Sequence, residues 1–251
     1  MNSRGKTTKG WMQYAAASLM TFAASGSATA ADASIPTYSA VYEVEYKGKS
    51  LGTCEFKVTY DAASDTYEFT SNTLAKGLLK LARPNPVVER SHFRLVDGRI
   101  RPIEFWSEDG SRKGEDNRHI EFDWHRSVAI VSGDGARREV ALDDRSLDRG
   151  SMQVALMRDM IVSQHPGDYR LAGEDASQGY AFTDTGETTT PTGIGPLTTR
   201  SVTMHREGSS RSTAFWFAPE LSYLPVRIEQ SKEGEVQTAF SLTSQTGLGK
   251  K

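Results

Sequence analysis

The segment from His119 to His125 holds a close group of potential metal ligands. His119, Glu121, Asp123 and His125 alternate with apolar residues, so in an extended strand the four polar side chains would share one face. Residues two apart on one face are separated by about 7 Å along a strand, which is too far for one ion unless the strand bends. The same alternation is typical of the wet face of an amphipathic strand. We favour that interpretation and predict neither a metal ion nor another cofactor.

Nucleophilic catalysis has equally weak support in the sequence. His205 lies near Ser209 and Ser210 at the expected end of a hairpin, but nothing there positions a base on a nucleophile, and the chain has no G-x-S-x-G motif. The glycine-rich stretch 193–196 ends in Pro196, which lacks the amide donor that a phosphate loop needs. We predict no catalytic residue. A hydrolase acting on envelope polysaccharide stays an alternative, because its paired carboxylates would not stand out among ordinary surface acids.

Cys54 is the single cysteine of the 251-residue chain. It alternates with Phe56 and Val58 on the apolar side of an expected strand. This placement favours a buried, inert thiol over a reactive one. With one cysteine the chain forms no internal disulfide, so its stability must come from a packed core.

The N-terminal 30 residues have the pattern of a secretory signal peptide. Arg4, Lys6 and Lys9 precede a mainly apolar stretch at 11–24, and small residues lead to Ala28-Thr29-Ala30. We expect cleavage between residues 30 and 31. The apolar stretch is shorter than the roughly 20 residues of a membrane-spanning helix. Residues 1–30 are therefore predicted to be a signal peptide and 31–251 a single exported domain that does not span a membrane.

The charge pattern argues against nucleic acid as a partner. Residues 1–30 contain three of the 30 basic side chains and none of the 32 acidic ones, so the remainder of the chain has a net charge of −5. The charges are interspersed along the sequence. Binding to nucleic acid or electrostatic docking on an anionic membrane requires a basic patch, and no such run is present.

Period-two alternation dominates the rest of the sequence and predicts a mainly β fold. Turn residues separate the alternating segments, including Lys47-Gly48-Lys49 and the hairpin dipeptide Asp97-Gly98. Short strands at steady spacing indicate a curved antiparallel sheet that forms an open barrel or half-barrel. The expected strands are 38–46, 53–60, 66–70, 91–96, 99–106, 119–124, 128–131, 138–142, 197–205, 211–217, 224–230 and 236–242.

Two segments depart from this alternation. Asp148 can cap a helix over about 150–163, whose broad apolar stripe predicts packing on the sheet. Residues 73–82 carry leucines between lysines and are followed by prolines, which allows one or two helical turns that could act as a lid. The Thr-, Gly- and Pro-rich stretch 186–196 is interpreted as a hairpin connection.

Aromatic residues late in the chain raise the question of a ligand. Trp216 and Phe217 must face opposite sides of their strand, so one belongs to the core. The aromatic side chains either fill the interior of the sheet themselves or line a partly open apolar groove, for which flexible methionines are well suited. For the groove we predict six ligand-binding residues: Trp216, Phe217, Tyr223, Leu78, Leu79 and Met157.

Several motifs resemble a family of exported Gram-negative proteins known only as a domain of unknown function. They are ETTTPTG at 187–193, Thr199-Arg200, FWFAPEL at 215–221 and YLPVRI at 223–228, which together give the signature W-x-A-P…L-P-V-R-I. Asp97-Gly98, Pro102 and the triplet 122–124 fit the same pattern. The resemblance covers most of residues 31–251 and implies a periplasmic, mostly antiparallel β domain. It implies no activity, cofactor or catalytic residue.

These observations lead to one functional hypothesis and two alternatives. The chain is predicted to be a periplasmic, non-catalytic module that binds an apolar or amphipathic envelope ligand, such as a lipid or an acyl chain. One alternative is a structural module that binds an envelope protein as its partner. The other is the polysaccharide hydrolase considered above.

Overall fold

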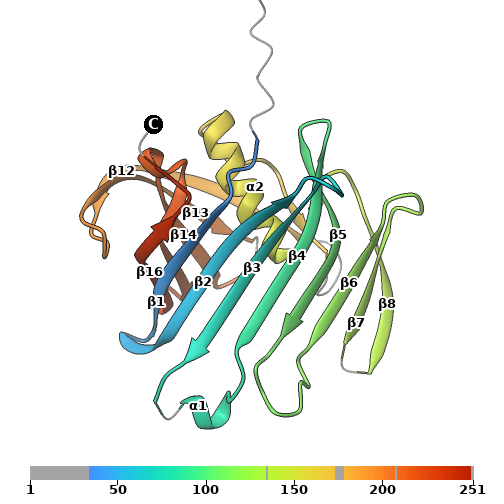
Figure 1. Ribbon diagram of the computed structural model, residues 1–251, viewed down its shortest axis with the longest axis horizontal. Coiled ribbons are helices and arrows are strands. Elements are labelled where there is room, and N and C mark those ends of the chain that lie inside the picture. Colours follow the sequence, from blue (N-terminus) through green and yellow to red (C-terminus); the bar gives the residue numbers. More distant parts are fainter. Residues whose placement is uncertain (1–33, 78, 134, 173–177, 207, 250–251) are drawn as a thin grey trace, which may run out of the picture. The chain divides into compact units, whose positions relative to one another are not determined.

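The computed structural model describes residues 34–77, 79–133, 135–172, 178–206 and 208–249, and these residues form a mainly β domain (Figure 1). The predicted signal peptide lies outside the described residues. The large sheet consists of β1 (Tyr38–Tyr46), β2 (Lys49–Asp61), β3 (Thr66–Ala75), β4 (Val87–Val96), β5 (Arg99–Glu108), β6 (Arg118–Asp123), β7 (Val128–Gly133), β8 (Ala136–Ala141), β12 (Ala181–Thr190), β13 (Leu197–His205), β14 (Arg211–Ala218), β15 (Leu224–Lys232) and β16 (Glu235–Thr246). The remaining elements are α1 (Leu79–Ala82), β9 (Ser146–Leu147), α2 (Arg149–Val162), β10 (Arg170–Leu171), β11 (Gln178–Gly179) and the 3₁₀ turn η1 (Pro219–Leu221).

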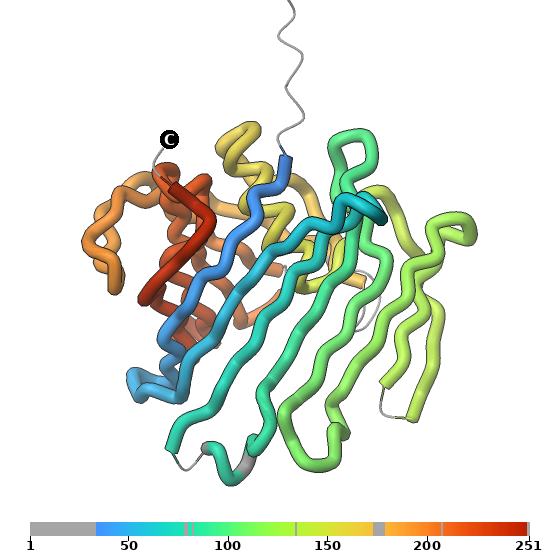
Figure 2. The backbone as a smooth tube through the Cα atoms, in the orientation of Figure 1, coloured from blue at the N-terminus to red at the C-terminus, as the bar shows by residue number. Residues whose placement is uncertain are grey.

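The large sheet has 13 strands and consists of two antiparallel meanders. Strands β1–β8 form one meander and β12–β16 the other, and they join where β16 pairs with β1 (Figure 2). The Tyr42 hydroxyl reinforces this junction by donating a buried hydrogen bond of 2.8 Å to the Pro225 carbonyl. Within the described part of the chain β8 and β12 are the outer strands and do not pair with each other, so the sheet is not closed into a barrel.

The sheet bends around α2. Strands β2 and β3 pass in front of this helix in Figure 1, and its buried residues share one core with residues of both meanders. Helix α2 packs on β3, β4 and β5. The predicted antiparallel sheet with one main packed helix is therefore confirmed.

Positive backbone angles at the two-residue turns set the register of the hairpins. The φ angles are 48° and 73° at Lys47 and Gly48, and 49° and 70° at Asp97 and Gly98. Such turns match the twist of antiparallel strands. The Asp97-Gly98 dipeptide thus connects β4 to β5 at the position expected from the sequence.

Helix α2 begins with a fully buried cap. The Asp148 carboxylate accepts hydrogen bonds from the backbone N–H groups of Gly150 and Ser151, at 2.8 and 2.9 Å, and from the Ser91 hydroxyl of β4 at 2.8 Å. A Cβ at Gly150 would lie only 2.9 Å from the Phe69 ring, so glycine allows the helix to approach the sheet. Asp148 therefore both starts the helix and fixes it to β4.

One core lies between α2 and the inner face of the sheet. It includes Cys54, which is buried as predicted, and burial raises the pKa of its thiol. The largest fully buried side chains are Tyr42, Phe69, Phe93, Phe105, Phe217, Leu156, Met157, Met160, Leu224, Leu242, Val58 and Val154.

Three details differ from the sequence-based expectations. Residues 186–190 belong to β12 and not to a connection; this outer strand is exposed on both faces and so lacks an apolar alternation. Thr73–Ala75 extend β3, which leaves only four residues in α1, and a role of α1 as a lid is not shown. The alternation of residues 236–242 predicts a buried side chain at Phe240, but Phe240 is half-buried and lines a cavity. No helix in the described ranges is long and apolar enough to cross a membrane.

Candidate functional site: a cavity lined by arginine and aromatic side chains

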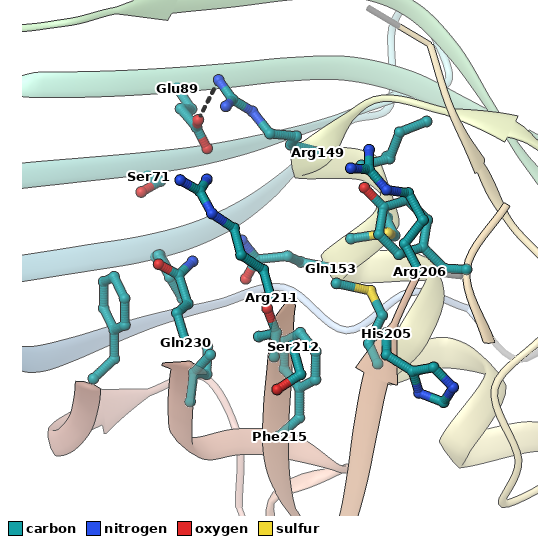
Figure 3. A pocket seen from close by; sticks show the side chains of 18 of the residues that line it. Ser71, Glu89, Arg149, Gln153, His205, Arg206, Arg211, Ser212, Phe215 and Gln230 are labelled. Carbon is teal, nitrogen blue, oxygen red and sulfur yellow. Dashed lines mark ion pairs between the residues drawn. The ribbon is translucent and has the colours of Figure 1, made fainter. Parts of the chain in front are cut away.

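The inner face of the sheet is not completely filled. A cavity of about 580 Å³ is bordered by the two meanders and by the first turns of α2 (Figure 3). This volume lies within the range of about 300–1,000 Å³ that is usual for small-molecule sites. Its apolar lining residues are Phe56, Val87, Phe105, Ile120, Met152, Leu171, Ala172, Tyr180, Met204, Phe215, Ile228 and Phe240.

The charged lining of the cavity is mostly basic. Arg118 comes from β6, Arg149 from the start of α2, and Arg206 and Arg211 from the connection and strand end between β13 and β14. Glu89 of β4 is the one carboxylate among the described lining residues. The cavity therefore combines excess positive charge with apolar walls.

The arginines are held in different ways. An Arg149 Nη2 lies 2.9 Å from a Glu89 carboxylate oxygen, and this ion pair is drawn in Figure 3. The Arg211 side chain extends from β14 across the cavity toward the side where Ser71 and Glu89 lie (Figure 3). Among the described residues, the guanidinium groups of Arg206 and Arg211 have no hydrogen-bond or ion-pair partner.

Uncharged polar groups complete the lining. The Gln153 Oε1 atom is buried and accepts no hydrogen bond from any described residue. The Ser71 hydroxyl lies 3.4 Å from the Cys54 sulfur. A buried acceptor without a partner is costly, so Gln153 marks a place where an occupant of the cavity would be stabilised by donating a hydrogen bond.

Four of the six sequence-predicted site residues can be placed, and none of them lines this cavity. Phe217 and Met157 are 1% and 2% exposed and lie in the core. Trp216 is half-buried on the other face of β14, with its ring centroid 6.0 Å from the Arg227 guanidinium carbon. Tyr223 is half-buried and packs at the edge of the core. The prediction that one residue of the pair 216–217 belongs to the core is confirmed.

The other two predicted residues cannot be assessed. Leu78 lies outside the described residues, as does the side chain of Leu79 at the start of α1. Binding roles for the six residues stay predictions.

The sequence reasoning missed the residues that do line the cavity. A detectable signal was present for Arg211, because it continues the inward alternation of Thr213 and Phe215 at the end of β14. The same periodicity identifies Phe56 as inward-facing. It gives no signal for Arg149 or Arg206, whose positions depend on how α2 and the β13–β14 connection meet in three dimensions.

The histidine-rich strand has structural contacts of its own. The His119 ring stacks on Trp106 at 5.3 Å between centroids, and its Nε2 atom forms a hydrogen bond with Glu104. The Asp123 carboxylate accepts hydrogen bonds from the backbone N–H groups of His125 and Arg126 in the following turn. In the ranges that the structure describes, no three His, Cys, Asp or Glu side chains cluster closely enough to hold a metal ion.

The possible nucleophile of the β13–β14 connection lacks a base. His205 and Ser209 both border the cavity. The Ser209 hydroxyl accepts a hydrogen bond of 3.1 Å from the Arg211 backbone, and no described hydrogen bond joins it to His205. The described part of the cavity thus offers binding groups rather than a paired nucleophile and base.

The family model described as "Protein of unknown function (DUF3108)" matches residues 41–239. The chain belongs to this family. The match covers α2, most of both meanders and every described residue of the cavity lining except Phe240. The family description assigns no activity, and none of the curated proteins that were compared matches the chain.

Two solved structures show distant similarity. A Parabacteroides distasonis protein described as a "putative lipoprotein" is 9% identical, with 84% of this chain and 95% of that chain covered and a TM-score of 0.36. MucB in complex with MucA(peri) is 10% identical, with 82% and 88% covered and a TM-score of 0.18. Similarities at these TM-scores carry no argument about the fold or function of the present chain.

Proposed function

We propose that this DUF3108 member is a non-catalytic, ligand-binding module of the bacterial envelope, and that its ligand is an amphipathic molecule with an acyl chain. The observation that carries the proposal is the cavity of about 580 Å³ on the inner face of the sheet. In this proposal the sheet works as a half-barrel with α2 packed inside it. The apolar chain of the ligand occupies the space between the meanders.

The chemistry of the walls supports an amphipathic ligand. Phe215 and Ile228 provide a rigid apolar surface, and Met152 and Met204 are flexible side chains that adapt to a long, mobile chain. Half-buried Phe240 packs against the core and also borders the cavity. A small number of polar groups in a largely apolar cavity is typical of sites that bind and orient one ligand.

The proposed location is the periplasm, reached after removal of residues 1–30. The positive start, the apolar stretch and the Ala28-Thr29-Ala30 sequence support export. The intact mass of protein purified from periplasm is expected to correspond to a chain beginning at Ala31. A mass that includes Trp11 would contradict this part of the proposal.

Leu78 and Leu79 remain proposed ligand contacts. The connection that contains them runs from Ala75, the last residue of β3, to Val87, the first residue of β4. Thr73 and Val87, near its two ends, line the cavity. Replacing both leucines by serine is expected to weaken ligand binding more than it lowers the free energy of unfolding. An equal effect on both quantities would remove them from the proposed site.

The function is tested with a fluorescent long-chain fatty acid and two tryptophan variants. Thr213 lines the cavity, whereas Ala214, the next residue of β14, points to the opposite face of the sheet. Thr213→Trp is expected to obstruct the cavity and to weaken binding of the probe at least about tenfold, while Ala214→Trp leaves it within about twofold of the wild type.

Unlabelled fatty acid should displace the probe from the wild-type protein, and thermal melts of both variants should show that they fold. The proposal fails if the wild type does not bind the probe at high micromolar concentration. It also fails if Thr213→Trp and Ala214→Trp bind the probe equally well. A partner-binding module would then become the leading hypothesis.

A further inference from the structure

The charge of the cavity is opposite to that of the chain as a whole. The full sequence has a formal net charge of −2, yet the described cavity lining contains four arginines and a single carboxylate. The arginines come from three separate parts of the chain: β6, the start of α2, and the region between β13 and β14. Folding thus gathers positive charge around one cavity, where Arg149 and Arg211 are exposed and Arg118 and Arg206 are half-buried.

The single acid cannot neutralise this group. The Glu89 carboxylate is already paired with Arg149 at 2.9 Å. Arg206 and Arg211 find no counter-ion among the described residues. Figure 3 shows the Arg211 side chain lying across the cavity rather than turned away from it. The guanidinium groups repel each other, and an anion bound between them offsets this repulsion. Their attraction for an anion is stronger in a cavity with apolar walls than in water.

Guanidinium groups restrict the chemistry of that anion. Their planar donors form paired hydrogen bonds with the oxygens of a carboxylate or a phosphate. The unpartnered Gln153 Oε1 atom adds an acceptor that a hydroxyl or N–H group of the same ligand can satisfy. Phe56, Phe215 and Phe240 provide the apolar surface beyond these groups.

We infer that the cavity selects amphiphiles with an anionic headgroup; this inference rests on the proposed function. Arg206 and Arg211 bind the headgroup, and the aromatic wall holds the acyl chain. Arg149 is fixed by Glu89 and contributes to the positive potential. A phosphate that carries a hydroxylated substituent satisfies both the arginines and Gln153. The cavity therefore discriminates by headgroup charge and not by chain length alone.

The test compares two lysolipids with the same acyl chain, used below their micelle-forming concentrations. Lysophosphatidylglycerol is anionic and hydroxylated, whereas choline cancels the phosphate charge in lysophosphatidylcholine. The wild-type protein is expected to bind the anionic lipid at least about tenfold more tightly. In the double variant Arg206→Gln/Arg211→Gln this preference should fall to within about twofold. Arg94→Gln, at an exposed position of β4 away from the cavity, is the matched control and should keep the full preference.

Other results would overturn the headgroup inference, the proposed function or both. Equal binding of both lysolipids by the wild type, with loss of both in Thr213→Trp, overturns the headgroup inference and leaves the proposed function intact. Inorganic phosphate that displaces the anionic lysolipid at equal concentration overturns the inference as well, because the site would then serve a small free anion. If neither lysolipid binds, both the inference and the proposed function fail. The comparison of the two lipids on the wild type needs no variant, so a folding defect in the double variant does not remove the test.

Discussion

The inner face of the sheet has two regions with different contents. Between α2 and the sheet, side chains such as Phe69 and Phe93 of the sheet and Met160 of the helix are completely buried. Beyond the first turns of the helix, Thr213 and Phe240 are only half-buried and border a cavity. A helix of 14 residues is about 21 Å long, and α2 packs on three strands of a 13-stranded sheet. One helix is thus too small to cover the bent sheet, and the uncovered part is available for a ligand.

Removing an aromatic ring from the packed region should lower the free energy of unfolding strongly. Phe217 is 1% exposed and lies in the core. Phe217→Ala leaves a cavity that the surroundings cannot refill, so the free energy of unfolding should fall by about 3–5 kcal/mol. Urea unfolding followed by circular dichroism measures this change.

The matched substitution is Phe240→Ala in the cavity wall. Its ring already borders empty space, so its loss should lower the free energy of unfolding by only about 1–2 kcal/mol. Equal losses for Phe217→Ala and Phe240→Ala would mean that the two regions are equally packed.

The cap of α2 lies between these regions and is expected to have the next largest effect. Asp148 is fully buried and accepts hydrogen bonds from α2 and from Ser91. Asp148→Ala removes the acceptor and leaves buried donors without partners, which should cost about 2–3 kcal/mol. Asp148→Asn, which retains a capping oxygen, should cost less. A cost below about 0.5 kcal/mol for Asp148→Ala would show that the helix is held by its apolar face alone.

The same residue predicts a pH dependence. Burial raises the pKa of Asp148 to about 6 from an ordinary value of 3.8, although its hydrogen bonds favour the charged form. Because the pKa of Asp148 is higher in the folded than in the unfolded protein, proton binding stabilises the fold at pH values below the unfolded pKa. This stabilisation is lost as the pH rises through about 6. The wild type should therefore gain up to roughly 3 kcal/mol relative to Asp148→Asn as pH falls from 7 to 4. A difference that is constant over this range in urea titrations would contradict the prediction.

Thiol accessibility provides the mildest contrast between the regions. Cys54 is buried, and burial raises the pKa of its thiol, so little reactive thiolate forms. It should resist a thiol reagent until the protein unfolds. A cysteine introduced by Thr213→Cys at the cavity, in a Cys54→Ser background, should react at least about 100-fold faster. Similar rates at the two positions would indicate that the core opens as readily as the cavity.

The packed region was largely predictable from the sequence, because local periodicity determines which side chains face inward. The alternation identified Cys54 and Phe56 as inward-facing residues of β2, and Asp148 correctly predicted the start of α2. The dipeptide Asp97-Gly98 fixed one hairpin. The outer strand β12 was not predicted, since an edge strand that is exposed along most of its length has no apolar period.

The cavity was not predictable in the same way. It depends on the β16–β1 pairing, which brings the end of the chain beside its beginning, and on how much of the sheet α2 covers. Arg149 and Arg211 are 62 positions apart in the sequence, and only this arrangement brings both of them to the lining of one cavity. The aromatic residues late in the chain led to the prediction of Trp216 as a ligand contact, but Trp216 lies on the other face of its strand.

Native mass spectrometry of the protein purified from periplasm tests the central claim most directly, because it requires no assumption about which ligand is bound. The account predicts an additional mass of lipid size on the wild type and on Ala214→Trp, which collisional activation releases, and its absence from Thr213→Trp, where the new ring obstructs the cavity. Wild-type protein without any bound mass, or the same bound mass on Thr213→Trp, would contradict the claim that this cavity is the binding site.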